Sequence, residues 1–224
     1  MRYWSTPPSV VAGPIPKLLL GVLAFLLMIP IAAGAQVVIN EIMADPAGDW
    51  DADGSYDYRA DEWIEVRNIG TDPVDLNDYW LRDGTGEDIH LRLFGTLAPD
   101  GVAVFYGSQA LAWQLAEGLT QTGFSLNNGG DAVHLLQTIP ETNPLELDLV
   151  DLATYGDHEA EDDRSSGLDL GAALWRLYDG LNAYGGDQLP GPTGCDPSPG
   201  EPNFCVPQVA VDELRFGTVK ALYR

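Results

Sequence analysis

From residue 37 onward the sequence is broken into short runs of β-branched and aromatic residues, separated by clusters of glycine, asparagine, aspartate and proline. Runs of this length, bounded by turn residues, are typical of β-strands. Seven such runs at this spacing predict an all-β fold in which two sheets pack as a β-sandwich. The expected strands are Val37–Met43, Glu62–Ile69, Val74–Asp83, Ile89–Phe94, Val102–Gly107, Ala132–Gln137 and Leu147–Tyr155.

One stretch, Ser108–Glu117, has helical periodicity instead. We expect a short helix between two strands, with Leu111, Ala112 and Leu115 on its inward side. After Asp179 the sequence becomes rich in glycine, proline and asparagine, which predicts an irregular but ordered loop or a last irregular strand.

The N-terminus has the order of features found in secretory signal peptides. Arg2 and Lys17 precede an unbroken apolar run, Leu18–Ile29, and small residues follow up to Ala35. The run is about 12 residues long, whereas crossing a bilayer takes about 20. We therefore expect residues 1–35 to be removed as a signal peptide, leaving a secreted protein with no membrane span.

The chain is strongly acidic, with 34 Asp and Glu against 11 Lys and Arg and a formal net charge of −23. Removal of residues 1–35 would take away two basic residues and no acidic ones, leaving 9 minus 34, or −25. Proteins that bind nucleic acids neutralise phosphates with Lys and Arg, so this charge argues against such a partner. An excess of short carboxylates suits divalent-cation loops, and it equally suits a solubilising surface.

Cys195 and Cys205 are the only cysteines. In an oxidising compartment two cysteines this close in sequence predict one disulfide that closes a short loop. Such a bond stabilises the fold by about 2 to 3 kcal/mol because it restricts the unfolded chain.

The strands and their turns follow one another in a specific order, and together they resemble the lamin-tail domain of exported bacterial proteins. The similarity covers nearly all of the chain after the signal peptide. The segments that carry it are "INEIMADP" (Ile39–Pro46), "DEWIEVRNIGTDPVDLNDYWLRDG" (Asp61–Gly84), "LAPDGVAVFYG" (Leu97–Gly107), "LNNGGDAVHLL" (Leu126–Leu136), "ATYGD" (Ala153–Asp157), "LWRLYDGLN" (Leu174–Asn182) and "SPGEPN" (Ser198–Asn203).

This resemblance implies an immunoglobulin-like β-sandwich over residues 36–205, followed by a C-terminal tail, residues 206–224, of unknown role. Asn40 and Glu41 lie beside apolar residues of the first strand, where polar side chains most often hydrogen-bond a neighbouring loop. We interpret them as residues that stabilise the fold and not as catalytic or ligand-binding residues.

The stretch "DWDADG" places Asp49, Asp51 and Asp53 at alternate positions before Gly54, as in the first half of an EF-hand calcium loop. The twelfth position of that motif is Ala60 and not glutamate, so an acid one or two residues later would have to complete the site. A solvated acidic hairpin tip is the open alternative. The predicted Ca²⁺ ligands are Asp49, Asp51, Asp53, Ser55 through its carbonyl, Asp57, Asp61 and Glu62.

Signals for catalysis are weak. His158 lies among acids in "GDHEAEDD", but this run lacks the ligand spacing of zinc motifs, and no nucleophile or phosphate-loop motif is present. We therefore expect a secreted, non-catalytic module with structural, adhesive or protein-interaction roles at the cell surface or outside, whose partner is a protein or a cell-surface glycan.

Two alternatives remain open. One is a metal-assisted extracellular hydrolase that uses the acids between Asp49 and Glu65 or the His158 loop. The other is a glycan-binding module that uses the aromatic residues of the acidic loop, Trp50, Tyr56 and Tyr58.

Overall fold

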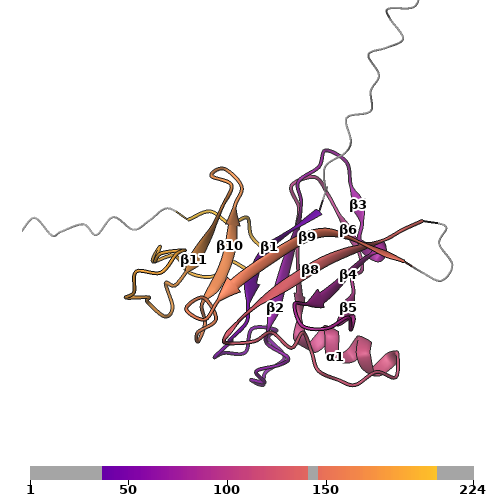
Figure 1. Cartoon of the computed structure of the whole chain (residues 1–224), viewed down its shortest axis with the longest axis horizontal. Coiled ribbons are helices and arrows are strands. Elements are labelled where there is room, and N and C mark those ends of the chain that lie inside the picture. The colour runs from indigo at the N-terminus through magenta and orange to yellow at the C-terminus, as the bar shows by residue number, and fades with distance from the viewer. Residues whose placement is uncertain (1–36, 141–145, 206–224) are drawn as a thin grey trace, which may run out of the picture. The chain divides into compact units, whose positions relative to one another are not determined.

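A computed structural model describes residues 37–140 and 146–205 of the chain (Figure 1). The predicted signal peptide, residues 1–35, and the C-terminal tail, residues 206–224, lie outside the described residues. Within the described residues no helix has the length and apolar character needed to cross a membrane.

The elements are short strands with one α-helix, as the sequence predicts. In chain order they are β1 (Val37–Met43), β2 (Trp63–Asn68), β3 (Val74–Asp75), the 3-10 turn η1 (Leu76–Asp78), β4 (Tyr79–Asp83), β5 (Leu91–Arg92), β6 (Thr96–Leu97), β7 (Val102–Tyr106), α1 (Gly107–Ala116), β8 (Gly130–Thr138), β9 (Leu147–Gly156), β10 (Ser165–Asp169) and β11 (Leu174–Tyr178).

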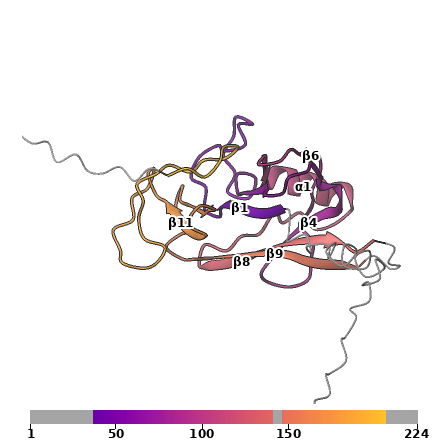
Figure 2. The same ribbon diagram turned by 90° about the horizontal axis from the view of Figure 1, so that it is seen from above.

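Two antiparallel sheets form a sandwich. The larger sheet has the order β11-β10-β1-β2-β7 and the smaller one the order β5-β4-β8-β9, while β3 and β6 pair separately. Seen from above, β1 lies in one layer and β8 with β9 in the other (Figure 2). The predicted all-β sandwich with one short helix is confirmed.

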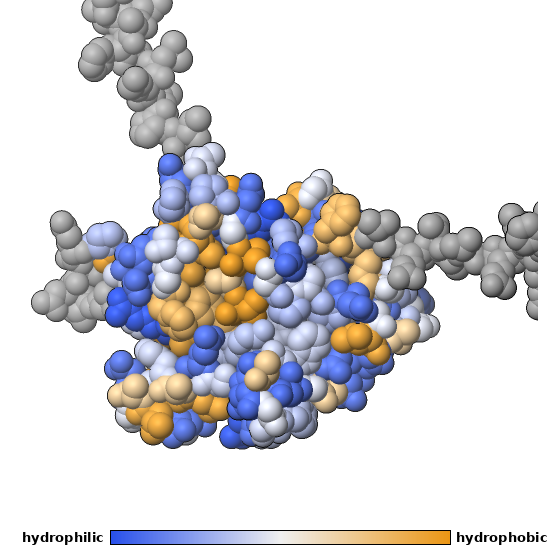
Figure 3. Space-filling model, turned by 180° about the vertical axis from the view of Figure 1, so that it is seen from behind, coloured by the Kyte–Doolittle hydropathy of each residue, from blue (hydrophilic) through white to orange (hydrophobic). Residues whose placement is uncertain are grey.

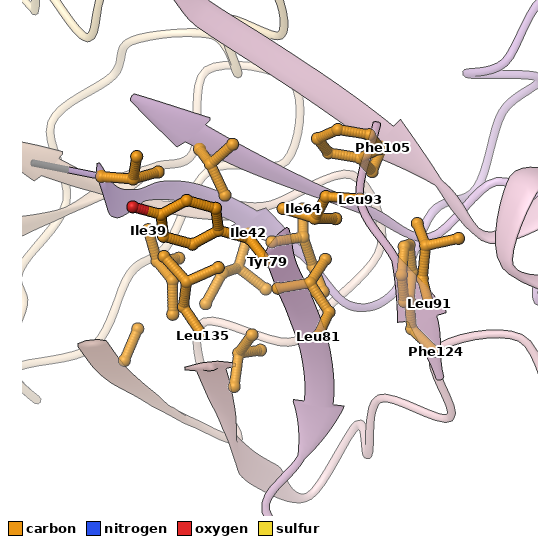
Figure 4. Packing of buried hydrophobic residues seen from close by; sticks show 14 of the residues in the cluster. Ile39, Ile42, Ile64, Tyr79, Leu81, Leu91, Leu93, Phe105, Phe124 and Leu135 are labelled. Atoms are coloured by element: carbon orange, nitrogen blue, oxygen red, sulfur yellow. The ribbon is translucent and has the colours of Figure 1, made fainter. Parts of the chain in front are cut away.

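The core lies between the two sheets, where the inward side chains of facing strands meet (Figure 4). Ile39 and Ile64 from the larger sheet pack with Leu81 and Leu135 from the smaller one, and all four are buried. Burial of such side chains stabilises the fold by about 1.5 to 3 kcal/mol each, relative to exposure.

A bulge in β1 decides which of its residues face the core. The pairing of β1 with β2 shifts between Ile39 and Glu41, so that Ile39 opposes Val66 whereas Glu41 opposes Glu65. One extra residue in a strand moves the following side chains to the other face. Ile39 and Ile42 therefore both point into the core, although they are three residues apart, and Glu41 points to the outer face.

The structure differs from the sequence prediction at several places. The expected strand Val74–Asp83 is divided by the turn η1 into β3 and β4, which belong to different sheets, and β6 was not expected. Only Leu91–Arg92 of the expected strand Ile89–Phe94 pairs as a strand. Strands β10 and β11 are absent from the pattern-based prediction. The inward side of α1 carries Ala110 and Gln114, whereas Leu115 is 63% exposed, because α1 packs through the Gln114 amide.

Substitution of Leu135 by alanine is expected to lower the free energy of unfolding by about 2 to 5 kcal/mol, because it leaves a cavity in the core. Urea unfolding followed by fluorescence measures the loss. The control is Leu149→Ala in the paired strand β9, where the side chain is 56% exposed and a change within about 0.5 kcal/mol is expected. Equal losses in the two variants would contradict this description of the core.

Candidate functional site

The segment between β1 and β2, which we call the acidic loop (residues 44–62), brings three aspartates together. One carboxylate oxygen from each of Asp49, Asp51 and Asp61 lies within 4.8 Å of the other two. Two oxygens on opposite sides of a Ca²⁺ ion, each about 2.4 Å from it, are about 4.8 Å apart. The group therefore has the spacing that a single divalent cation requires.

Asp61 organises the acidic loop. It is fully buried and lies two residues before β2 begins. Its Oδ1 accepts hydrogen bonds from the backbone N–H groups of Trp50 (2.7 Å) and Asp51 (3.1 Å), and its Oδ2 accepts one from Asp57 (2.8 Å). The loop thus folds around one carboxylate, which explains how residues ten positions apart in sequence converge.

Gly54 provides the turn in this loop. Its φ is +92°, a left-handed conformation that glycine adopts without strain. Its N–H donates to Oδ2 of Asp49 (2.9 Å), and the N–H of Asp53 donates to Oδ1 of Asp49 (3.1 Å) and of Asp51 (3.0 Å). These bonds orient the carboxylates of Asp49 and Asp51, which occupy the first and third positions of the EF-hand sequence pattern.

Three other predicted ligands lie in the same loop but outside the group of three. The carboxylate of Asp53 accepts from the N–H of Ser55 (2.8 Å), and that of Asp57 accepts from the N–H of Arg59 (2.9 Å). These bonds form local turns of the kind that aspartate commonly makes with the backbone two residues later.

Glu62, the last predicted ligand, lies in a different environment. Its buried carboxyl group accepts hydrogen bonds from the backbone of Leu126 and Ser125, and burial raises its pKa to about 9. Its carboxyl group thus lies against Ser125 and Leu126 and is not part of the group of three aspartates.

A second loop, residues 157–164 between β9 and β10, is joined to the acidic loop. Oδ1 of Asp163 accepts from the N–H of Ala47 (2.8 Å) and from Nε1 of Trp50 (2.7 Å), and the N–H of Asp163 donates to the carbonyl of Asp45 (2.9 Å). Trp50 also packs on Trp63, with ring centroids 6.0 Å apart. No sequence pattern indicates this contact, because the bonded residues are more than a hundred positions apart.

Joining the two loops concentrates negative charge. The pKa of Asp45 is raised, first by desolvation and further by the charges of Asp162, Glu161 and Asp163. Among the described residues, no ion pair involves Asp45, Asp163 or the group of three aspartates. A bound cation would relieve this repulsion.

The outer face of the larger sheet carries a second acidic feature. Glu41 and Glu65 are cross-strand neighbours on β1 and β2, and both are fully buried. Oε1 of Glu41 accepts from the Ser165 hydroxyl and from the N–H of Ser198 (3.1 Å), and Oε2 accepts from the Ser198 hydroxyl (2.8 Å). Buried carboxyl groups require such donors, because an unpaired one is costly.

Glu65 is held in the same way. Its Oε1 accepts from the side-chain amide of Asn40, and its Oε2 accepts from the N–H of Gly200 (2.6 Å). Nδ2 of Asn203 donates to the carbonyl of Asn40 (2.6 Å). The prediction that a side chain here hydrogen-bonds a neighbouring loop is confirmed for Glu41, whereas the Asn40 side chain bonds Glu65 on the adjacent strand β2.

The donors on Ser198, Gly200 and Asn203 belong to one segment, residues 195–205, which we call the clasp. The predicted disulfide between Cys195 and Cys205 is present and closes this segment into a loop. The clasp thus covers the two glutamates and ties the end of the described chain to its first two strands.

Desolvation by burial is the main cause that raises the pKa of both glutamates. It raises the pKa of Glu65 to about 7, and the charge of Glu41 is a smaller contribution in the same direction. Neither carboxyl group is exposed, so in this structure the pair cannot contact a substrate as acid and base.

The His158 loop likewise holds its histidine in structural contacts. His158 is buried, its Nε2 lies 3.2 Å from the carbonyl of Pro190, and its ring packs 5.0 Å from that of Tyr184. The aromatic residues of the acidic loop differ in exposure. Trp50 is half-buried, whereas Tyr56 and Tyr58 are 54% and 55% exposed.

A comparison with known families agrees with this fold. The sequence model of the family described as Lamin Tail Domain matches residues 30–157. This range is more than half of the chain and contains strands β1 to β9, the acidic loop and both buried glutamates. No curated protein and no solved structure matches the chain.

The raised pKa of Glu65 predicts a pH-dependent stability. A folded-state pKa of about 7, against an ordinary value of 4.5, means that the folded state binds more protons between these values. The contribution of protonated Glu65 to the free energy of unfolding is therefore complete below about pH 4.5, and it is lost as the pH rises to 7. From Glu65 alone we expect the free energy of unfolding to fall by about 3 kcal/mol over this range.

Glu65→Gln removes this titration, so its stability is expected to depend less steeply on pH than that of the wild type, as measured by denaturant unfolding at several pH values. Glu201→Gln, at an exposed position in the clasp, should keep the wild-type slope. Parallel curves for wild type and Glu65→Gln would contradict the assignment.

Proposed function

We propose that this chain, which belongs to the lamin tail domain family, is a secreted, non-catalytic module that binds Ca²⁺ in its acidic loop and serves a structural or adhesive role at the cell surface or outside. The chain is an immunoglobulin-like β-sandwich module. Because one sandwich fold hosts many unrelated functions, the proposal depends on its loops and not on the fold.

Two features support an extracellular location. The first is the signal-peptide pattern of residues 1–35. The second is the Cys195–Cys205 disulfide, because disulfides persist mainly in oxidising compartments.

The convergence of Asp49, Asp51 and Asp61 is the observation that carries the calcium proposal. Carboxylate oxygens are the ligands that Ca²⁺ prefers, and backbone carbonyls and water commonly complete its shell of six to eight. A bound ion would also link the exposed part of the loop to buried Asp61 and so make the acidic loop more rigid.

The surface offers places for a protein or glycan partner. Tyr56 and Tyr58 are exposed on the acidic loop, where a Ca²⁺ ion would fix their positions. Seen from behind, hydrophobic residues gather in a patch with hydrophilic residues around it (Figure 3). Contiguous apolar patches on soluble proteins commonly mark interaction sites.

Millimolar Ca²⁺ is expected to raise the thermal unfolding midpoint by several degrees relative to the protein in excess chelator. A ligand at about 100 times its Kd stabilises the folded state by about 2.7 kcal/mol. Asp51→Asn is expected to reduce this shift strongly, because it removes a charge from the group of three.

Asp53→Asn is the matched control. It removes the same charge two residues away, outside the group, and the amide oxygen can keep the hydrogen bond to Ser55. The proposal predicts a shift in Asp53→Asn close to that of the wild type. No shift in the wild-type protein, or equal loss in both variants, would refute the calcium site.

A further inference from the structure

A groove with a volume of about 680 Å³ lies beside the end of β9, the strand at one edge of the smaller sheet. Thr154 lines it from β9, Asp157 from the turn after β9, Trp175 from β11, and Leu189 from the loop that follows β11. None of the described residues that line the groove belongs to the acidic loop or to the clasp. The groove is therefore a separate candidate site.

The outer edge of β9 presents backbone groups at every second residue. The N–H of Leu152 donates to Oδ1 of Asp151 (2.9 Å), and the N–H of Gly156 donates to Oε2 of Glu159 (2.6 Å). Both N–H groups thus bond acidic side chains and not the neighbouring strand β8, so they point away from the sheet. Alternate residues of an antiparallel edge strand direct their N–H and C=O groups to the same side. The backbone groups of Thr154 therefore point outward as well.

Thr154 differs from its two neighbours on this edge because no side chain caps it. Among the described residues, no hydrogen bond joins its N–H or C=O to a group on the open side of β9. Thr154 is exposed and lines the groove. Unpaired backbone groups at a sheet edge can pair with another extended chain. The acidic caps at Leu152 and Gly156 restrict such pairing to a short segment opposite Thr154.

Apolar side chains lie beside this free edge. Leu189 is 87% exposed, and Trp175 is half-buried and packs against the core. An exposed leucine next to an indole ring offers a contact surface for an apolar side chain of a ligand.

Asp157 determines the charge that the groove favours. Its side chain is 70% exposed, and the nearest ring nitrogen of His158 lies 3.9 Å away, beyond hydrogen-bond distance. Neither lysine nor arginine is among the described residues that line the groove. The formal net charge of the chain, −23, attracts basic molecules from a longer range. The groove is thus complementary to a ligand with a basic side chain.

We propose that this groove binds a short extended peptide segment of a partner protein, in which a basic residue accompanies an apolar one. The backbone of the segment pairs with Thr154 at the edge of β9. Its apolar side chain packs on Trp175 and Leu189, and its basic side chain pairs with Asp157. This inference rests on the proposed role as an interaction module and adds the chemistry of the partner. It does not depend on the Ca²⁺ site.

The test is a titration of the purified protein with a short capped peptide of alternating arginine and valine, followed by NMR of the backbone amides. We expect the Thr154 amide resonance to shift and its hydrogen exchange to slow. The amide of Gly54 in the acidic loop is the internal control and should not respond. Binding should be equal in Ca²⁺ and in excess chelator.

Two matched peptides separate the contributions. N-methylation of the central residue removes a backbone donor and keeps the side chains, and it is expected to weaken binding about tenfold. Replacement of every arginine by glutamate is expected to abolish binding. Equal binding of the parent and the N-methylated peptide would overturn the proposed strand pairing.

Protein variants test the same contacts. Asp157→Asn is expected to weaken binding about two- to fivefold, whereas Asp148→Asn, an exposed acid on β9 outside the groove, should leave it unchanged. Thr154→Pro removes the outward N–H at an edge position, where proline is tolerated, and should weaken binding about tenfold. The Asp157→Asn comparison decides the matter if the proline variant fails to fold.

Three results would overturn the proposal. One is equal loss of binding in Asp157→Asn and Asp148→Asn, which would indicate attraction by net charge alone. Another is equal shifts at Thr154 and Gly54. The third is a shift of Thr154 by neutral maltooligosaccharides and not by the peptide, which would make the groove a glycan site. Peptide binding without a thermal response to Ca²⁺ would refute only the calcium site.

Discussion

The central constraint on this structure is that two carboxyl groups, Glu41 and Glu65, lie side by side and fully buried on the outer face of the larger sheet. A buried carboxyl group without hydrogen-bond donors would cost several kcal/mol, so a cover that supplies donors is required. The clasp supplies them from Ser198 and Gly200, and the disulfide keeps both donors in one short loop. The first two strands and the last described residues are thereby one structural unit.

This unit extends beyond the range that the family comparison covers. The match ends at residue 157, whereas β10, β11 and the clasp follow it. Ser165 of β10 donates to Glu41, so the later strands help to satisfy an acid within the matched range. The clasp contacts the outer face of the larger sheet through Glu41 and Glu65. On this account the sandwich is a rigid support, and the proposed Ca²⁺ contacts belong to the acidic loop.

The sequence predicted most of the strands because alternation in runs such as Val133–Leu135 reflects burial on one face. It missed β10, where polar and glycine residues face the clasp and hydrogen bonds replace apolar contacts. It also placed Leu115 inward, since periodicity cannot reveal that a buried Gln114 amide holds the helix. In the acidic loop the pattern identified Asp49, Asp51 and Asp61, but it could not show that Glu62 is buried elsewhere or that Asp163 joins from another loop.

The most direct test of the central constraint is an NMR titration of the glutamate side-chain carboxyl carbons. The account predicts that Glu65 titrates near pH 7 and Glu41 well above its ordinary range, and that the Gly200 amide resonance follows the Glu65 midpoint because the two groups are bonded. Titration of both glutamates near pH 4.5, with no response at Gly200, would mean that the clasp does not cover them.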